Sequence, residues 1–372
     1  MIYLDNAATS LLKPPEVAKA MTTAMRTMAS PGRGGHEPAA KAADTAFRCR
    51  EELSEFFRAP GPEHVAFTMN ATHALNIAIA TLVKPGDRVV ISGYEHNAVT
   101  RPLHMLGAET DAAVSPLFEP EAAIEAFRKS LPGAKCCVCT HVSNVFGFIL
   151  PVEVIAAMCR EYGVPFVLDA SQSAGVLNVD MEALGAEFVA MPGHKGLLGP
   201  QGTGVLLCRD RARPIMAGGT GSESRNQAMP ETLPDALEAG THNIPGIAGL
   251  LAGLRYVKRR GLESIDAHER KLKGLMCRKL AGISGLEVFS SPTAQSGVLS
   301  VRSGKLGSEE IAAALGARGV AVRAGLHCAP LAHQSAGTLE GGTVRFSFSP
   351  FNNAAEIDRA AAELVRILKM SS

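Results

Sequence analysis

The stretch Pro165-Phe166-Val167-Leu168-Asp169-Ala170-Ser171-Gln172 is an apolar run that ends in a carboxylate. Its length and its branched and aromatic residues are typical of a buried strand. Lys195 follows 26 residues after Asp169, in the turn Pro192-Gly193-His194-Lys195-Gly196, and the glycine-rich run 199–204 predicts tight turns beside it. Ligands of open α/β sheets bind outside the carboxyl ends of the strands, so Asp169 and Lys195 are expected at one ligand site.

Short apolar runs and amphipathic stretches alternate on both sides of this segment. The spacing predicts strands at 65–67, 88–91, 135–140, 165–169, 188–190 and 204–207, and helices at 15–29, 40–58, 71–82, 98–106 and 151–162. Alternating elements of this length predict an α/β fold with a mostly parallel central sheet and helices on both faces.

The pattern changes after about residue 245. A long helical stretch at 245–281 precedes expected strands near 297–302, 320–323 and 343–348 and helices at 308–317 and 353–369. The Gly/Ser-rich stretch 217–224 and the polar stretch 225–242 are expected to be loops. We therefore predict a large domain at 15–245 and a smaller α+β C-terminal domain at 246–372, with residues 1–14 packing alongside.

Composition narrows the function classes. The 372 residues are 46% hydrophobic and 20% charged with a net charge of +1, so no bulk electrostatic attraction favours nucleic acid or an anionic membrane. The first residues do not have the pattern of a signal peptide, and no apolar run approaches the ~18 residues of a membrane helix, so a cytoplasmic protein is expected.

The eight cysteines are expected to be free thiols, since a long chain without a signal peptide is typical of a reducing compartment. Cys136, Cys137 and Cys139 resemble a metal cluster at first sight. They lie in an apolar run of strand type, and no second cysteine pair follows at zinc-site spacing. The sequence therefore predicts a buried strand there and no metal site.

Lysine and a strand-terminal carboxylate suit pyridoxal 5'-phosphate (PLP). This cofactor needs a lysine for its Schiff base, a carboxylate that keeps the pyridine nitrogen protonated, and a cradle for its phosphate. The N-terminus of a helix can provide that cradle. Asn70-Ala71-Thr72 lies between a predicted strand and a predicted helix and offers backbone N–H groups and a hydroxyl. An ordinary helix N-cap is the alternative role for Asn70.

With these residues the chain resembles the class V aminotransferase family of fold-type-I PLP enzymes, and within it the cysteine desulfurase and selenocysteine lyase branch. The resemblance extends from Tyr3-Leu4-Asp5-Asn6-Ala7-Ala8 to Arg345. It implies that Lys195 carries the cofactor and that Asp169 pairs with the pyridinium nitrogen. It further implies ring contacts by Gln172 at the hydroxyl, His96 on the ring face and Asn144 beside the hydroxyl and the substrate.

The same resemblance implies how the phosphate is held. Ala71, Thr72 and His194 would bind it, and Thr241 would reach the phosphate of the other subunit, so a homodimer is implied. One position departs from the family pattern: Pro192 stands where the family commonly has a serine, which removes one phosphate hydroxyl.

The run Arg323-Ala324-Gly325-Leu326-His327-Cys328-Ala329-Pro330 bears on the reaction. Nearby cations favour a thiolate, although a buried structural cysteine would also explain Cys328. The run resembles the short-loop desulfurase pattern Arg-x-Gly-x-His-Cys-Ala, which implies that Cys328 is the nucleophile. Arg345 is a charge in a strand-like run, and its planar fork suits a carboxylate. The resemblance implies that Arg345 binds the substrate carboxylate; an internal salt bridge is the alternative. Arg323 is expected to assist either the substrate or the loop.

We therefore predict a cysteine desulfurase that converts L-cysteine to L-alanine and retains the sulfur on Cys328 as a persulfide. Lys195 would transfer the α-proton, His96 would exchange the thiol proton, and a sulfur-acceptor protein is expected but unidentified. The alternatives are a selenocysteine lyase, another class V reaction such as transamination or β-elimination, and a binding protein that has lost catalysis. Lys195, Asp169, His96, Cys328 and Arg345 are all present, which argues against the last.

Overall fold

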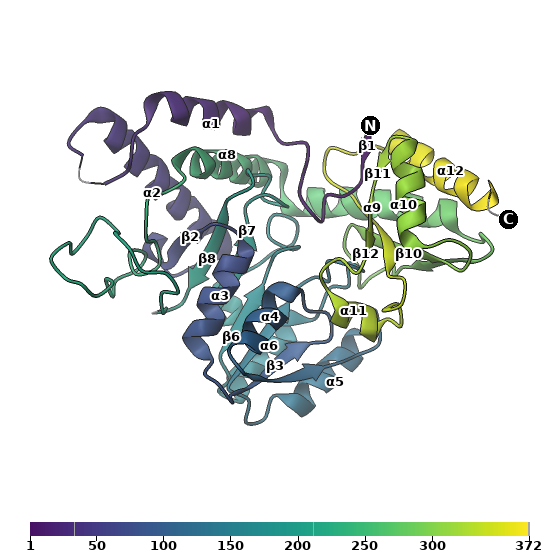
Figure 1. The fold of residues 1–372 in the computed structure, drawn as a ribbon, viewed down its shortest axis with the longest axis horizontal. Helices are drawn as coiled ribbons and strands as arrows, with labels where there is room; N and C mark the ends of the chain where they lie inside the picture. The colour runs from purple at the N-terminus through teal and green to yellow at the C-terminus, as the bar shows by residue number, and fades with distance from the viewer. Residues whose placement is uncertain (33, 211, 371–372) are drawn as a thin grey trace.

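The computed structural model describes residues 1–32, 34–210 and 212–370. Figure 1 shows a large body built around a seven-stranded sheet and, on the right, a smaller body with its own four-stranded sheet. This arrangement of a large α/β part and a smaller α+β part is the architecture predicted from the sequence.

The central sheet contains the six strands predicted in this part of the chain and one, β4, that was not predicted. Its strands are β2 (Val65–Thr68), β3 (Arg88–Ser92), β4 (Glu109–Ala113), β5 (Cys136–Thr140), β6 (Phe166–Asp169), β7 (Phe188–Pro192) and β8 (Gly204–Cys208). They lie in the order β2-β8-β7-β6-β5-β3-β4; β8 runs antiparallel to both β2 and β7, and the other neighbouring strands pair in parallel. All five residues of β5 are buried, so the cysteine-rich run is a core strand, as predicted.

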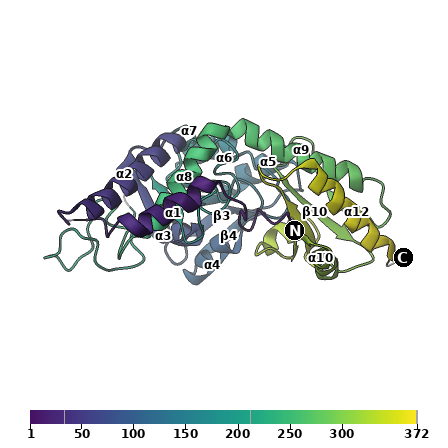
Figure 2. The same ribbon diagram turned by 90° about the horizontal axis from the view of Figure 1, so that it is seen from above.

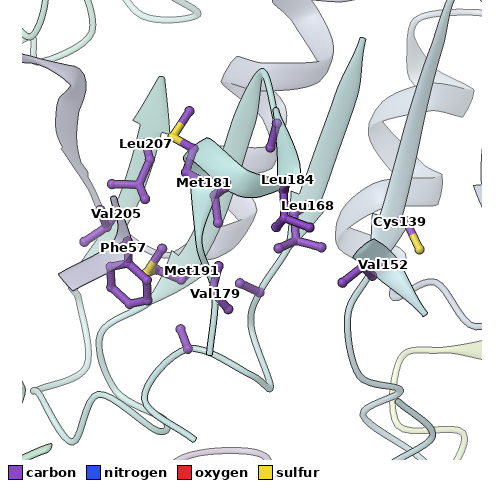
Figure 3. Packing of buried hydrophobic residues seen from close by; sticks show 14 of the residues in the cluster. Phe57, Cys139, Val152, Leu168, Val179, Met181, Leu184, Met191, Val205 and Leu207 are labelled. Atoms are coloured by element: carbon purple, nitrogen blue, oxygen red, sulfur yellow. The ribbon is translucent and has the colours of Figure 1, made fainter. Parts of the chain in front are cut away.

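Helices cover both faces of this sheet. They are α1 (Pro15–Thr27), α2 (Glu37–Phe57), α3 (Ala71–Leu82), α4 (Asn97–Met105), α5 (Pro120–Ser130), α6 (Val152–Glu161) and α7 (Met181–Leu184), with a short 3-10 helix at Pro62–His64. Figure 3 shows Phe57 and Met181 packed against Leu168, Met191 and Val205 on neighbouring strands. Burial of such side chains contributes about 1.5–3 kcal/mol each, which fixes the strands that carry the site residues.

The smaller body is an antiparallel sheet covered by helices. Its strands are β9 (Leu286–Phe289), β10 (Val298–Ser303), β12 (Arg323–Gly325) and β13 (Thr343–Ser347), in the order β12-β13-β10-β9. Its helices are α10 (Ser308–Ala317), α11 (Pro330–Ser335) and α12 (Ala354–Met370). The start of the chain joins this body, because β1 (Ile2–Tyr3) pairs with β11 (Val320–Ala321) and Leu4 is buried in the same core.

The helical stretch predicted at 245–281 is two helices, α8 (Ile244–Arg260) and α9 (Leu262–Leu280). Gly261 separates them with a φ of 82°, a left-handed conformation that glycine adopts without strain. Helix α8 packs against α1 and α2, whereas α9 packs against α12 (Figure 2). The predicted domain boundary after residue 245 therefore lies at the start of α8, and the division of the chain there stays a prediction.

Within the described ranges, no helix combines the length and the apolar character needed to cross a membrane.

A buried amide connects the two bodies. Gln295 is fully buried, and its Nε2 donates to the carbonyl oxygen of Phe146 in the large body at 2.8 Å and to that of Val298 on β10 at 2.9 Å. Its Oε1 accepts from Lys273 Nζ on α9 at 2.9 Å and from the backbone N–H of Ser291 at 2.9 Å. One side chain thus satisfies polar groups of three separate segments.

Replacing Gln295 by leucine should lower the free energy of unfolding by about 2–4 kcal/mol, because a similar volume is kept while several buried polar groups lose their partner. Urea unfolding followed by circular dichroism measures this change. Exposed Gln334 on α11 is the matched control, and its replacement by leucine should stay within about 0.5 kcal/mol of the parent. Equal unfolding midpoints for the two variants would contradict this role of Gln295.

Candidate active site

One cavity lies at the carboxyl ends of β6 and β7, where the sequence places it. Its lining includes eight of the nine predicted cofactor residues: Ala71, Thr72, His96, Asn144, Asp169, Gln172, His194 and Lys195. The ninth, Thr241, is exposed and lines a different cavity with His73 and Glu238. The fold thus brings together residues that span more than 120 positions of the chain.

Asp169 and Lys195 form the charged pair of this cavity. Asp169 ends β6, is 2% exposed, and accepts a hydrogen bond on Oδ1 from the backbone N–H of Ser171 at 2.9 Å. Lys195 lies in the turn after β7, which is closed by the bond from the N–H of Gly199 to the carbonyl of Gly193 at 2.7 Å. Burial lowers the pKa of Lys195 to about 8, and the negative charge of Asp169 opposes that shift. A lysine with a lowered pKa supplies the neutral amine that carbonyl chemistry requires.

His96 is the N-cap of α4. Its Nδ1 accepts the backbone N–H of Ala98 at 3.0 Å, which leaves Nε2 as the ring nitrogen that can exchange a proton. Burial lowers the pKa of His96, although the charge of Asp169 raises it. The imidazole is therefore a neutral ring that lines the cavity with Asp169 and Lys195.

The opposite end of the cavity is formed by the start of α3. Asn70 is the N-cap, since its side chain accepts the backbone N–H of His73 at 2.9 Å, so this alternative role is present. A Cβ on Gly204 would lie 2.5 Å from the backbone of Asn70, which shows how closely β8 approaches the helix start. The first N–H groups of a helix lack intrahelical acceptors and attract anions.

These residues fit PLP by the chemistry of their donors. The first residues of α3 line the cavity and can offer N–H groups to a phosphate, a buried carboxylate ends β6, and a buried lysine follows β7. His194 lines the same end, and its Nδ1 lies 3.0 Å from Thr9 Oγ1. Burial and the charge of Lys195 lower the pKa of His194 to about 4, so this ring is neutral. Pro192 lines the cavity where the family pattern has a serine.

Glu95 is a buried neighbour of the cavity lining, and the sequence analysis gave it no role. It is fully buried next to His96, and its Oε1 accepts from Ser92 Oγ and from the backbone N–H of Thr140 at 2.7 Å. Its Oε2 has no partner among the described residues. Burial raises the pKa of Glu95 to about 8, so the group holds a proton at neutral pH. A glutamate shortly after the apolar run 89–91 is the sequence signal that could have found it.

Cys328 lies on the loop between β12 and α11 and is exposed. His327 and Cys328 both have left-handed φ values, 51° and 56°, which are unfavourable for residues with a side chain. The large body holds this conformation: Asn144 Nδ2 donates to the carbonyl of His327 at 2.8 Å, and the N–H of Asn97 donates to the carbonyl of Cys328 at 2.7 Å. The cysteine loop is therefore docked beside His96 and Asn144.

Two buried histidines support the loop from within the small body. His327 Nε2 lies 3.3 Å from the carbonyl oxygen of Arg323, and its Nδ1 lies 3.5 Å from His333 Nε2. His333 Nδ1 lies 2.8 Å from Thr338 Oγ1. Burial lowers the pKa of His327 to about 3 and that of His333 to about 4. Both rings are neutral, so they position the loop without adding charge to it.

Arg345 does not lie free for a ligand in this structure. Its NH2 donates to Asp5 Oδ1 at 2.8 Å and its NH1 donates to the carbonyl oxygen of Asn144 at 2.9 Å, so the internal salt bridge is formed. Arg323 Nε pairs with Asp5 Oδ2 at 3.1 Å. Sequence reasoning quoted Asp5 within a resemblance and gave it no role, because its partners lie more than 300 residues away.

The residues that follow Asp5 lie between the two bodies. The N–H of Ala7 donates to Ser347 Oγ on β13 at 2.8 Å, and Gln172 Nε2 donates to the carbonyl of Ala7 at 3.0 Å. The N–H of Ser10 donates to the carbonyl of His194 at 3.0 Å. The N-terminal segment, residues 5–10, thus connects the cavity of the large body to the arginine-bearing strand of the small body.

The described residues contain no group of three side chains suited to a metal ion.

The family model for class-V aminotransferases matches residues 2–360. The chain belongs to the class-V aminotransferase family. This membership covers almost the whole chain and agrees with the resemblance in the sequence.

Among class-V relatives, a probable cysteine desulfurase from Pyrococcus abyssi is 33% identical, and the match covers 100% of this chain and 96% of that protein. The solved apo structure of a cysteine desulfurase from Thermococcus onnurineus NA1 is 32% identical with a TM-score of 0.91, covering 99% and 95% of the two chains. A cysteine desulfurase from Escherichia coli, at 24% identity and a TM-score of 0.87 over 100% and 95%, shares the fold. The fold-type-I architecture predicted from the sequence is confirmed.

Replacing Glu95 by glutamine should change how stability depends on pH. The unfolded chain loses this proton above about pH 4–5, while the folded protein keeps it up to a pKa of about 8. The parent therefore loses stability between these values. The glutamine variant has no group that ionises at this position. We therefore expect the unfolding free energy of the variant minus that of the parent to rise with pH across this range and to stay constant at higher pH.

Urea unfolding from pH 5 to pH 9 measures that difference. Exposed Glu121 on α5 is the control for the substitution itself. A difference for Glu95→Gln that stays flat with pH would show that the buried carboxyl is already ionised.

Proposed function

We propose that this class-V aminotransferase relative is a PLP-dependent cysteine desulfurase that converts L-cysteine to L-alanine and holds the released sulfur on Cys328. The observation that carries the proposal is the docking of the exposed Cys328 loop, through Asn144 and Asn97, beside a cavity that holds Lys195 and Asp169. An exposed cysteine that is fixed beside a lysine–carboxylate site suits sulfur transfer better than simple amino-group transfer.

When bound, PLP supplies an electron sink for negative charge that develops on the substrate. The chain supplies the rest. Lys195 Nζ, with its lowered pKa of about 8, takes and returns the proton of the substrate α-carbon. The carboxylate of Asp169 stabilises a positive charge at its end of the cavity. The start of α3, together with His194, binds an anion at the opposite end. The face of His96 bounds the cavity, and its Nε2 exchanges the thiol proton.

Sulfur transfer is assigned to Cys328. Its thiolate attacks the sulfur of the bound amino acid, a sulfur–sulfur bond forms, and the bond between that sulfur and the substrate β-carbon breaks. The electron pair stays on the carbon fragment, which gains a proton and leaves as alanine. Because Cys328 is exposed, its terminal sulfur can then pass to an acceptor protein, which is part of the proposal.

A homodimer is also part of the proposal. Thr241 lies outside the cavity of its own chain, on a segment where Glu238 is held by Arg50 at 2.6 Å and by His242 at 2.6 Å. Thr241 is exposed three residues after this buried ion pair, so it can contact a second subunit, which supports a role at the phosphate of that subunit.

The test is L-cysteine turnover with alanine and protein-bound persulfide both measured. The parent should form equal amounts of alanine and transferred sulfur, whereas Cys328→Ala should lose both products and still bind L-cysteine. Part-buried Cys277 on α9 is the matched control, and Cys277→Ala should keep parent activity. Full sulfide release by Cys328→Ala would remove Cys328 as the nucleophile. Repeating the series with L-selenocysteine would reveal a selenium substrate that is processed without the cysteine.

A further inference from the structure

Asp5 lies between two arginines at the edge of the small body. Its Oδ1 accepts from Arg345 NH2 at 2.8 Å, and its Oδ2 pairs with Arg323 Nε at 3.1 Å. The side chain of Arg345 is 2% exposed and that of Asp5 is 13% exposed, whereas Arg323 is 51% exposed. Asp5 therefore places a carboxylate on the same two arginines that the sequence predicts to bind the carboxylate of an amino acid.

The donors of Arg345 are only partly used. A guanidinium has five N–H donors, and two of its nitrogens already bind Asp5 and the carbonyl of Asn144, while Nε has no partner among the described residues. A buried guanidinium without a counter-ion is unstable, so Asp5 is what allows Arg345 to stay charged before any ligand arrives. The Nε atom is enclosed as well as unpartnered, so a further acceptor can reach this guanidinium only where the contact with Asp5 gives way.

We infer that Asp5 is a built-in competitor for the substrate carboxylate and sets how tightly amino acids bind at Arg345. The inference rests on the proposed function and on the expectation from the sequence that Arg345 receives the carboxylate of the substrate. An incoming carboxylate must share the guanidinium with Asp5, so it meets the negative charge of Asp5 and weakens the existing ion pair. Asp5 cannot diffuse away, since Leu4 before it is buried in the core of the small body.

The competition acts on substrate and product alike. L-Alanine carries the same carboxylate as L-cysteine, so Asp5 also weakens the retention of product and favours its release. Asp5 is thus a residue that tunes affinity through Arg345 and takes no part in the bond-breaking steps.

The test uses the holoenzyme and two ligands that differ in one charge, L-alanine and L-alaninamide. Calorimetric titration should show that the parent prefers L-alanine by less than about tenfold, because Arg345 is already neutralised. In Asp5→Asn, which keeps the shape and removes the charge, that preference should grow by a further factor of about ten. The KM for L-cysteine should fall by a similar factor. Asp5→Glu keeps the charge and should keep the parent ratio.

Asp358 on α12 forms an exposed ion pair with Lys279 on α9. Asp358→Asn is therefore the control for loss of a carboxylate and should leave the ratio unchanged. An Asp5→Asn ratio equal to or below that of the parent, with an unchanged melting temperature, would overturn the inference. If Asp5→Asn does not fold, the test rests on the parent protein alone. A parent that binds L-alanine more than about a hundredfold more tightly than L-alaninamide would mean that Arg345 is not neutralised.

A parent that binds neither ligand would show that the arginine pair is not a carboxylate site, and the inference would fall. These titrations need no turnover. A parent that shows the expected ligand ratios and does not desulfurate L-cysteine would therefore remove the proposed function and keep the inference.

Discussion

The buried positive charge of Arg345 is the constraint on which the arrangement of this molecule depends. A guanidinium that is 2% exposed within a strand needs a fixed negative partner. That partner, Asp5, comes from the start of the chain, so the first residues must pair with the small body before they continue to α1. The same path carries residues 5–10 past His194 and Gln172, which joins the cavity to the arginine-bearing strand.

Burial leaves few charges around this cavity. It raises the pKa of Glu95 to about 8, and it lowers the pKa of His194 and of His333 to about 4. These three groups are uncharged at neutral pH. The electrostatic field of the site is then dominated by two opposite pairs, Lys195 with Asp169 and Arg345 with Asp5. A site with so few fixed charges responds strongly to each charge that a ligand brings, because little solvent screens it.

The parts of the fold that sequence reasoning predicted are those with a local signal. Helix α3 was predicted to the residue, since Asn70 caps its start and β-branched and leucine residues continue to Leu82. The strand ends that carry Asp169 and Lys195 follow from apolar runs that stop at polar residues. Strand β4 was missed, because most of its residues are exposed or half-buried at the sheet edge and give no apolar run.

Other features could not be predicted, because distant contacts decide them. The periodicity of 245–281 continues through Gly261, and only the different packing partners of α8 and α9 reveal the break. Asp5 pairs with a residue 340 positions away, and no local pattern shows that separation. In the sequence Glu95 has the pattern of a surface charge beside His96, and only the packing of the surrounding strands shows that it is buried. The sequence pattern thus located the polar residues at the ends of strands. It did not identify the residues that they contact in the fold.

The break at Gly261 has a geometrical consequence. Among the described residues the backbone passes between the two bodies at two places, once through the N-terminal segment and once at Gly261. Away from these crossings the bodies are joined by side-chain contacts, among them the bonds from Gln295 to Phe146 and from Asn144 to His327. The Cys328 loop can therefore leave the cavity only when such contacts open, because the two backbone crossings alone do not hold it there.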